Sequence, residues 1–127
     1  SLDETSIVAF AQEWDPQPFH VDKAAAEASV FGALCASGLQ TLLLTYRQFL
    51  RLALFEGTTL AGLGMEQMKL LLPVLAGDRL RVRVEVAEAT PTSKPDRGLL
   101  KVRMTTFNQA DAPVSELTLV MLVRRRT

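Results

Sequence analysis

Two side chains near the N-terminus, Asp15 and His20, carry the groups that move protons near neutral pH. A carboxylate and an imidazole that share one water molecule can remove its proton and supply a proton elsewhere. Pro16 and Pro18 lie between them and restrict the backbone, which is how a short segment can hold two side chains in place. The spacing alone leaves a structural interpretation open, in which Asp15 caps a turn and His20 packs beside Phe19.

A second chemical element is the pair Ser37-Gly38, which precedes a long apolar stretch. Backbone N–H groups at the start of a helix carry partial positive charge and can hold an oxyanion, and glycine permits close approach. The motif Ser37-Gly38-Leu39-Gln40 also fits a capping box, so the same residues could do no more than begin a helix. Cys35 lies just upstream, and with no second histidine to activate it we expect a buried, small apolar residue.

The composition is that of an ordinary globular domain, with 48% hydrophobic and 22% charged residues in a chain of 127. A chain of this length can bury a core without metal or disulfide bonds, which excludes disorder and small disulfide scaffolds. We therefore expect one domain over residues 1–127. A single cysteine and a single histidine make a structural zinc site implausible, and the lone cysteine favours a cytoplasmic protein.

The charges balance, with 14 Lys and Arg against 14 Asp and Glu, so no net field draws the molecule to nucleic acid or to anionic lipid. Acids predominate in residues 1–66 and bases in residues 67–127, an asymmetry that could mark a face for an anionic ligand. No apolar run approaches the ~20 residues needed to span a bilayer. These patterns predict neither a nucleic-acid partner nor a membrane partner.

Hydrophobic spacing indicates the elements that would position the candidate residues. An amphipathic helix is predicted near the N-terminus and ends at Asp15, where the prolines favour extended backbone. A rigid loop follows over residues 14–22, and Asp22 can cap a short helix over residues 23–27. The residues that define the first helix are Ile7, Phe10, Ala11 and Trp14.

The clearest helix is predicted over residues 39–55, beginning after Ser37 and ending before Gly57. Its residues placed at 100° steps form one arc without polar side chains. We expect this arc to be enclosed core rather than a membrane or partner surface. The arc consists of Leu39, Leu42, Leu43, Tyr46, Phe49, Leu50, Ala53 and Leu54.

After the helix the hydrophobic period changes to two, which predicts strands separated by short, turn-rich stretches. Such short connections suit antiparallel neighbours. One long apolar helix followed by an antiparallel sheet predicts an α+β fold in which the sheet wraps around the helix. Four strands barely surround such a helix, so we expect a further strand upstream of Ser1, or a partner subunit, to complete the sheet. The strands are predicted at residues 67–72, 79–86, 99–107 and 114–124.

The candidate residues and elements occur in two segments, FAQEWDPQPFHVDKAAAEASVFGALCASGLQTLLL and MKLLLPVLAGDRLRVRVEVAEA. The first resembles the signature of the MaoC-like dehydratase family, which includes (R)-specific enoyl-CoA hydratases. The second resembles the strand, turn and strand that follow the helix in that family. The resemblance implies a hot-dog fold, an antiparallel β-sheet wrapped around one long central α-helix, usually assembled as a dimer. It also implies that part of the family's first strand is missing upstream of residue 1.

The resemblance further implies a reaction, the reversible syn addition of water to a trans-2-enoyl thioester to give a 3-hydroxyacyl thioester. The family's catalytic Asp and His match Asp15 and His20, and its oxyanion-binding amide matches Gly38. No metal or redox cofactor is implied, because the CoA or acyl-carrier arm belongs to the substrate.

Two positions depart from the pattern of the (R)-specific hydratases. Ser37 stands where a histidine usually precedes the oxyanion glycine, and Tyr46 stands where a helix serine orients the Asp. Tyr46 could narrow the acyl tunnel or supply the missing hydroxyl to Asp15. The acyl-chain length and the choice between CoA and an acyl carrier stay open, with the loop at residues 93–98 as a candidate for binding CoA phosphates.

Two other functions remain compatible with the sequence. A hot-dog thioesterase also polarises a thioester carbonyl at a helix start. A non-catalytic acyl-binding or dimerisation module could be built on the same scaffold, because a fold does not by itself decide a function.

Overall fold

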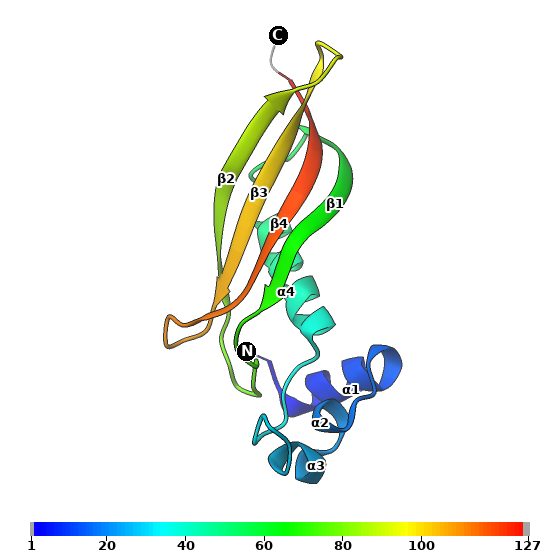
Figure 1. Ribbon diagram of the computed structural model, residues 1–127, viewed down its shortest axis with the longest axis vertical. Coiled ribbons are helices and arrows are strands. Elements are labelled where there is room, and N and C mark those ends of the chain that lie inside the picture. The colour runs from blue at the N-terminus through cyan, green and yellow to red at the C-terminus, as the bar shows by residue number, and fades with distance from the viewer. Residues whose placement is uncertain (1, 126–127) are drawn as a thin grey trace.

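The computed structural model of the chain describes residues 2–125, which form four helices and four strands. The helices are α1 (Glu4–Trp14), α2 (Pro18–Val21), α3 (Lys23–Glu27) and α4 (Gly38–Arg51), and the strands are β1 (Thr59–Leu70), β2 (Arg81–Pro91), β3 (Arg97–Phe107) and β4 (Pro113–Arg124). α4 lies against one face of the sheet, whereas α1, α2 and α3 gather beyond one end of it (Figure 1). The α+β prediction is confirmed. No helix within residues 2–125 is both long enough and apolar enough to cross a membrane.

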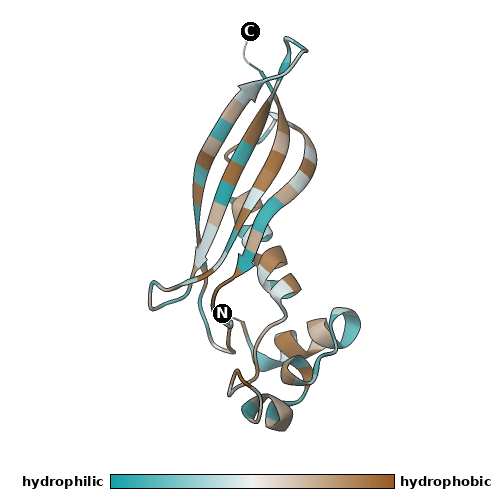
Figure 2. Cartoon of the chain, in the orientation of Figure 1, coloured by the Kyte–Doolittle hydropathy of each residue, from teal (hydrophilic) through white to brown (hydrophobic). Residues whose placement is uncertain are grey.

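The four strands form one antiparallel sheet in the order β1-β4-β3-β2, so β1 and β2 are its edges. Alternating hydropathy along the strands is visible in Figure 2. β3 and β4 lie within two residues of their predicted bounds, and β2 runs on to Pro91 from a predicted end at residue 86. β1 begins at Thr59 rather than at residue 67. Three register shifts interrupt its pairing with β4, and such irregularities break the period of two that would have revealed this half of the strand.

The structure contradicts the prediction that the apolar arc of the long helix is enclosed core. In the protomer the arc residues Leu39, Leu43, Leu50 and Leu54 are between 51% and 56% exposed. Phe49 is the arc residue that α4 buries, and it packs with residues of β3 and β4. The hydrophobic stripe is therefore real, but most of it faces away from the sheet.

Hydroxyl groups share with Phe49 the face of α4 that meets the sheet. Thr41 and Thr45 are buried there, and the Thr45 hydroxyl lies 2.7 Å from the Thr106 hydroxyl of β3. Thr45 also donates to the Thr41 carbonyl at 2.9 Å, so Thr106 donates to Thr45 and both hydroxyls are satisfied. A polar stripe can be buried at little cost when its groups bond to one another, which is why apolar periodicity alone assigns the wrong face.

α4 also ends earlier than predicted, at Arg51 rather than at residue 55. Ala53 adopts a left-handed φ of 53°, which interrupts the helical hydrogen bonds, and the chain then turns through Gly57 at a φ of 78°. Gly57 therefore belongs to the turn that leads into β1, where only a residue without Cβ adopts such a conformation at no steric cost.

Candidate active site

The connection between α1 and α2 brings Asp15 and His20 together. Asp15 follows the last residue of α1, and its N–H donates to the Ala11 carbonyl at 2.8 Å. The Gln17 N–H donates back to the Asp15 carbonyl at 2.8 Å, and Pro18 then begins α2, which carries His20. The predicted rigid loop is thus a tight turn followed by a short helix, and a proline suits the first position of that helix because its φ is already helical.

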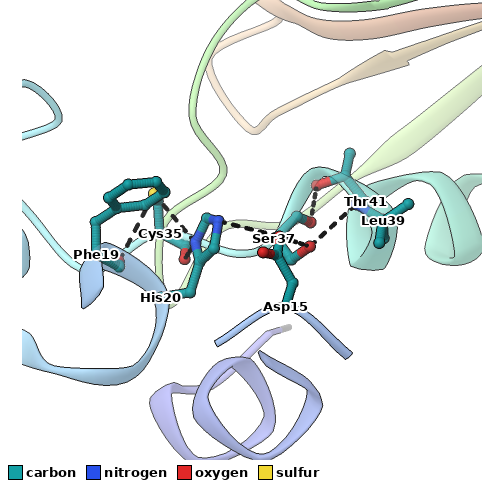
Figure 3. Close-up of polar contacts among 7 residues, drawn as sticks. All are labelled: Asp15, Phe19, His20, Cys35, Ser37, Leu39 and Thr41. Carbon is teal, nitrogen blue, oxygen red and sulfur yellow. Dashed lines mark hydrogen bonds and ion pairs between the residues drawn. The ribbon is translucent and has the colours of Figure 1, made fainter. Parts of the chain in front are cut away.

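A main-chain carbonyl determines the tautomer of His20. The Nδ1 atom lies 2.7 Å from the carbonyl oxygen of Cys35, which can only accept, so Nδ1 carries a proton. In the neutral ring Nε2 is therefore an unprotonated acceptor. This Nε2 lies 3.5 Å from Oδ2 of Asp15, which is long for a direct hydrogen bond. Two acceptors consequently face each other beside α1 (Figure 3).

The segment that supplies this carbonyl is itself held by the turn before β2. An isolated antiparallel bridge joins Cys35 to Leu75, and the Ala36 N–H donates to the Val74 carbonyl at 2.8 Å. The Cys35 side chain is 2% exposed, as predicted, and burial raises the pKa of its thiol. Cys35 therefore serves His20 through its backbone, a role that its residue type does not indicate.

Ser37 caps α4 and also reaches Asp15. Its Oγ accepts from the Leu39 N–H at 3.2 Å and donates to Oδ2 of Asp15 at 2.7 Å (Figure 3). Gln40 does not return a hydrogen bond to the cap as a capping box would require; its amide instead donates to the carbonyl and the hydroxyl of Ser6, at 3.3 Å each. The predicted helix start is confirmed, whereas the capping box is only half formed.

Gly38 begins α4 and, with Asp15 and His20, lines a cavity. Within the described residues no hydrogen-bond partner is found for its N–H, which stands at the positive end of the helix. The side chain of Leu70 rests against the glycine so closely that a Cβ at this position would overlap Leu70 Cδ1. A larger residue here would force the end of the Leu70 side chain to move, whereas the backbone conformation of Gly38 does not demand glycine.

The candidate residues open into one cavity of about 580 Å³. Asp15, His20 and Gly38 line it, and most of the other lining residues are apolar. Within residues 2–125 no three His, Cys, Asp or Glu side chains come together as a metal site would require. The remaining wall residues include Phe31, Cys35, Thr41, Leu70, Leu71, Leu72 and Val74.

The structure does not place Tyr46 at this cavity. Tyr46 lines a separate cavity of about 360 Å³ beside the C-terminal half of α4, where its ring stacks on Phe49 at 6.3 Å between centroids. It neither contacts Asp15 nor narrows the cavity that Asp15 lines. In the protomer the hydroxyl that reaches Asp15 comes from Ser37, which precedes the helix, and not from Tyr46.

The predicted phosphate loop lies far from the candidate residues in the protomer. It forms the hairpin between β2 and β3, at the end of the sheet opposite α1, α2 and α3 (Figure 1). There Arg97 pairs with Asp96 at 2.9 Å. Any contact of this loop with a ligand of the cavity would have to be made in another copy of the chain.

Comparison with known proteins agrees with this architecture. The family model of the MaoC like domain matches residues 1–107. The uncharacterized protein YdeM of Bacillus subtilis (strain 168) is 33% identical over 124 residues, which cover 98% of this chain and 87% of that protein. The MaoC-like dehydratase structure from Rhodospirillum rubrum is 37% identical at a TM-score of 0.90, covering 99% of this chain and 86% of that one. The R-hydratase PhaJ1 from Pseudomonas aeruginosa is 28% identical at a TM-score of 0.71, covering 99% and 77%.

The chain belongs to the MaoC-like dehydratase family and has the hot-dog fold, as the resemblance in sequence implied. Its relatives of known structure include dehydratases and hydratases, so the family assignment and the geometry of the cavity point to the same class of chemistry.

Proposed function

We propose that the protein is an acyl-thioester hydratase or dehydratase, which adds water reversibly to a trans-2-enoyl-CoA or to an enoyl group on an acyl carrier. The observation that carries the proposal is the convergence of Asp15 Oδ2 and His20 Nε2, 3.5 Å apart, beside the helix start at Gly38. Family membership and the relatedness to an R-hydratase support the same reaction class.

The paired acceptors form a binding site for one water molecule. With the proton of His20 on Nδ1, Nε2 is left without a donor, and the Asp15 carboxylate has lone pairs beyond the one that accepts from Ser37, so a water can donate one hydrogen to each. Its oxygen then presents a lone pair away from the protein. A water held in this way is both oriented for attack and in contact with a base.

In the hydration direction, the water oxygen forms a bond to C3 of the enoyl group as its proton passes to one of the two acceptors. The electrons of the C2–C3 double bond move toward the thioester oxygen, and the Asp15 and His20 pair then returns one proton to C2. The product is a 3-hydroxyacyl thioester, and all atoms of one water are retained. The addition of water involves no net oxidation or reduction, so the step requires no redox cofactor.

The Gly38 N–H supports the charge that develops on the thioester oxygen. It lies at the positive end of α4, and within the described chain no protein group uses it. A preorganised donor of this kind contributes about 3 kcal/mol to lowering a barrier. The apolar wall formed by Leu70, Leu71 and Leu72 offers a surface for the acyl chain.

The proposal is tested with trans-2-enoyl-CoAs from crotonyl upward, by following the loss of absorbance of the conjugated double bond. We expect turnover in the wild type and a loss of roughly 100-fold or more in Asp15→Asn and in His20→Ala, because each removes one group of the acid–base pair. Undiminished turnover in both variants contradicts the proposal. Thiol release from saturated acyl-CoA would instead identify a thioesterase, and binding without either reaction would identify a non-catalytic module.

We further propose that the functional unit is a homodimer. Leu70, Leu71 and Leu72 are 59%, 42% and 45% exposed although they line the cavity, and Leu39, Leu43 and Leu50 of α4 are each more than half exposed. An apolar patch of this kind on a monomer normally marks an interface. A second copy covering it would also close the open wall of the cavity.

A further inference from the structure

Ser37 is fully buried, and its hydroxyl makes more contacts than helix capping requires. To cap α4 the Oγ atom needs only to accept from the Leu39 N–H. The hydroxyl proton takes no part in that contact, and the structure directs it to Oδ2 of Asp15 at 2.7 Å. The two bonds together determine the orientation of the hydroxyl, because one uses it as acceptor and the other as donor.

No other side chain is found to donate to the Asp15 carboxylate in the part of the chain that the structure describes. His20 makes no close hydrogen bond to it, since Nδ1 is used by the Cys35 carbonyl and Nε2 lies 3.5 Å from Oδ2. The carboxylate is attached to the end of α1, an element separate from the one that carries Gly38. Without Ser37, the side chain of Asp15 would be free to rotate relative to the start of α4.

We propose that Ser37 is a positioning residue that fixes the Asp15 carboxylate relative to the oxyanion-binding N–H of Gly38. Ser37 and Gly38 are consecutive, so one hydrogen bond and one peptide unit set the distance between the base and the oxyanion donor. The proposal rests on the proposed function, because it assigns Asp15 and Gly38 their roles in that reaction. In this role Ser37 positions Asp15 and does not itself bind the substrate.

The kinetic test compares Ser37→Ala, Ser37→Gly and Ser37→Thr. Alanine loses both the cap and the donor, whereas glycine is a fair helix cap and loses mainly the donor. We expect kcat to fall about 10- to 100-fold in both, as for a hydrogen bond to a charged group, with KM changed less than about threefold. Threonine keeps the hydroxyl and is expected to retain most of kcat. Asp3→Ala, which removes the cap of α1 far from the cavity, is the matched control: it should lower stability without lowering kcat.

A double-mutant cycle shows whether Ser37 acts through Asp15. In an Asp15→Ala background, Ser37→Ala is expected to change the residual rate by less than about twofold, because the group that it positions is gone. The same loss in both backgrounds, or full kcat in the alanine and glycine variants, overturns the proposal.

A measurement without turnover separates this proposal from the proposed function. In protein labelled with carbon-13 at aspartate side chains, the Asp15 carboxyl resonance is expected to move on Ser37→Gly and to stay in place on Asp3→Ala. If enoyl thioesters are not hydrated but the resonance moves, the contact is real and the reaction assigned to it is wrong. An unmoved Asp15 resonance overturns the positioning role whatever the substrate.

Discussion

At the scale of the residue, main-chain groups determine what the candidate catalytic side chains can do. The Cys35 carbonyl keeps the His20 proton on Nδ1, and the Leu39 N–H leaves the Ser37 hydroxyl free to donate only toward Asp15. Neither relation depends on the side chain at position 35 or 39. The chemistry of the site therefore depends on where two backbone segments run.

Gly38 and Leu70 form a contact that can be tested by compensation. In Gly38→Ala the new methyl group overlaps Leu70 Cδ1, whose exposed side chain can move into the cavity. We expect the variant to fold and to lose roughly 10- to 100-fold in kcat/KM, because the substrate is misplaced at the helix start. Adding Leu70→Ala should restore part of the loss, measured by enoyl-CoA hydration. Full activity in Gly38→Ala, or no recovery in the double variant, would contradict this account.

The thiol of Cys35 provides a prediction about pH. Burial raises its pKa, so the native thiol stays protonated at pH values where an exposed thiol ionises. Since the thiolate is the nucleophile, iodoacetamide should label the native protein far more slowly than the unfolded chain. The unfolded chain gives up this proton first as pH rises, so the contribution of Cys35 to stability is complete below the ordinary thiol pKa and declines above it. Cys35→Ala is the control, and rapid labelling of the native protein would refute the prediction.

The candidate residues themselves could be predicted from sequence, but the contacts among them could be predicted only where the residues are close together in the chain. Asp15 and His20 are five positions apart, and the prolines between them indicate restraint. The bond from Ser37 to Asp15 spans 22 positions and depends on how α1 docks against the start of α4. No local pattern reports that docking, and the family resemblance offered the Tyr46 hydroxyl only as one of two alternatives.

At the scale of the element, α4 is held to the sheet by a buried hydroxyl pair whose two members are not equivalent. Thr45 can donate to the Thr41 carbonyl, whereas Thr106 depends on Thr45 as its acceptor. Thr45→Val should therefore cost about 1–3 kcal/mol, because it leaves a buried hydroxyl unpaired, and Thr106→Val should cost less. The free energies of unfolding of the two single variants are measured by urea denaturation, and the double variant, which lacks both hydroxyls, is the control. Equal losses in the two single variants would contradict the assigned donor direction.

Hydrophobic periodicity located most elements but not the face on which α4 packs. Hydrophobic periodicity counts only apolar side chains. A buried stripe of threonines that are hydrogen-bonded to one another is therefore not recognised as a face of the core. The same limitation affected β1, whose glycines and register shifts remove the alternation before residue 67. The sheet, the helix and the α+β class could be predicted, whereas contacts that depend on hydroxyl pairing could not.

At the scale of the whole molecule, the exposed face of α4 predicts self-association. Leu43→Glu combined with Leu50→Glu places charges in the proposed interface and should reduce the mass measured by light scattering to that of one protomer. Val30→Glu is the matched control, because Val30 is 96% exposed and lies outside α4 and the sheet. A wild type that is monomeric at every concentration, or an unchanged mass in the double variant, would contradict the homodimer.

Several properties of the whole molecule stay predictions. The cytoplasmic location rests on cysteine usage, and the single domain over residues 1–127 rests on chain length and composition. The family match covers residues 1–107, and β4 (Pro113–Arg124), which lies beyond it, pairs with both β1 and β3 inside the sheet. The last strand is thus as much a part of the fold as the matched region.

Because most of the apolar arc of α4 faces away from the sheet, the degradation of the protein in a cell would depend on its assembly. A protomer without a partner displays a row of leucines to water, which is the kind of surface that chaperones and proteases bind. Copies in excess of what can assemble would then be removed by general quality control, with no dedicated degradation signal. The amount of protein in the cell would then depend on how tightly the two protomers associate.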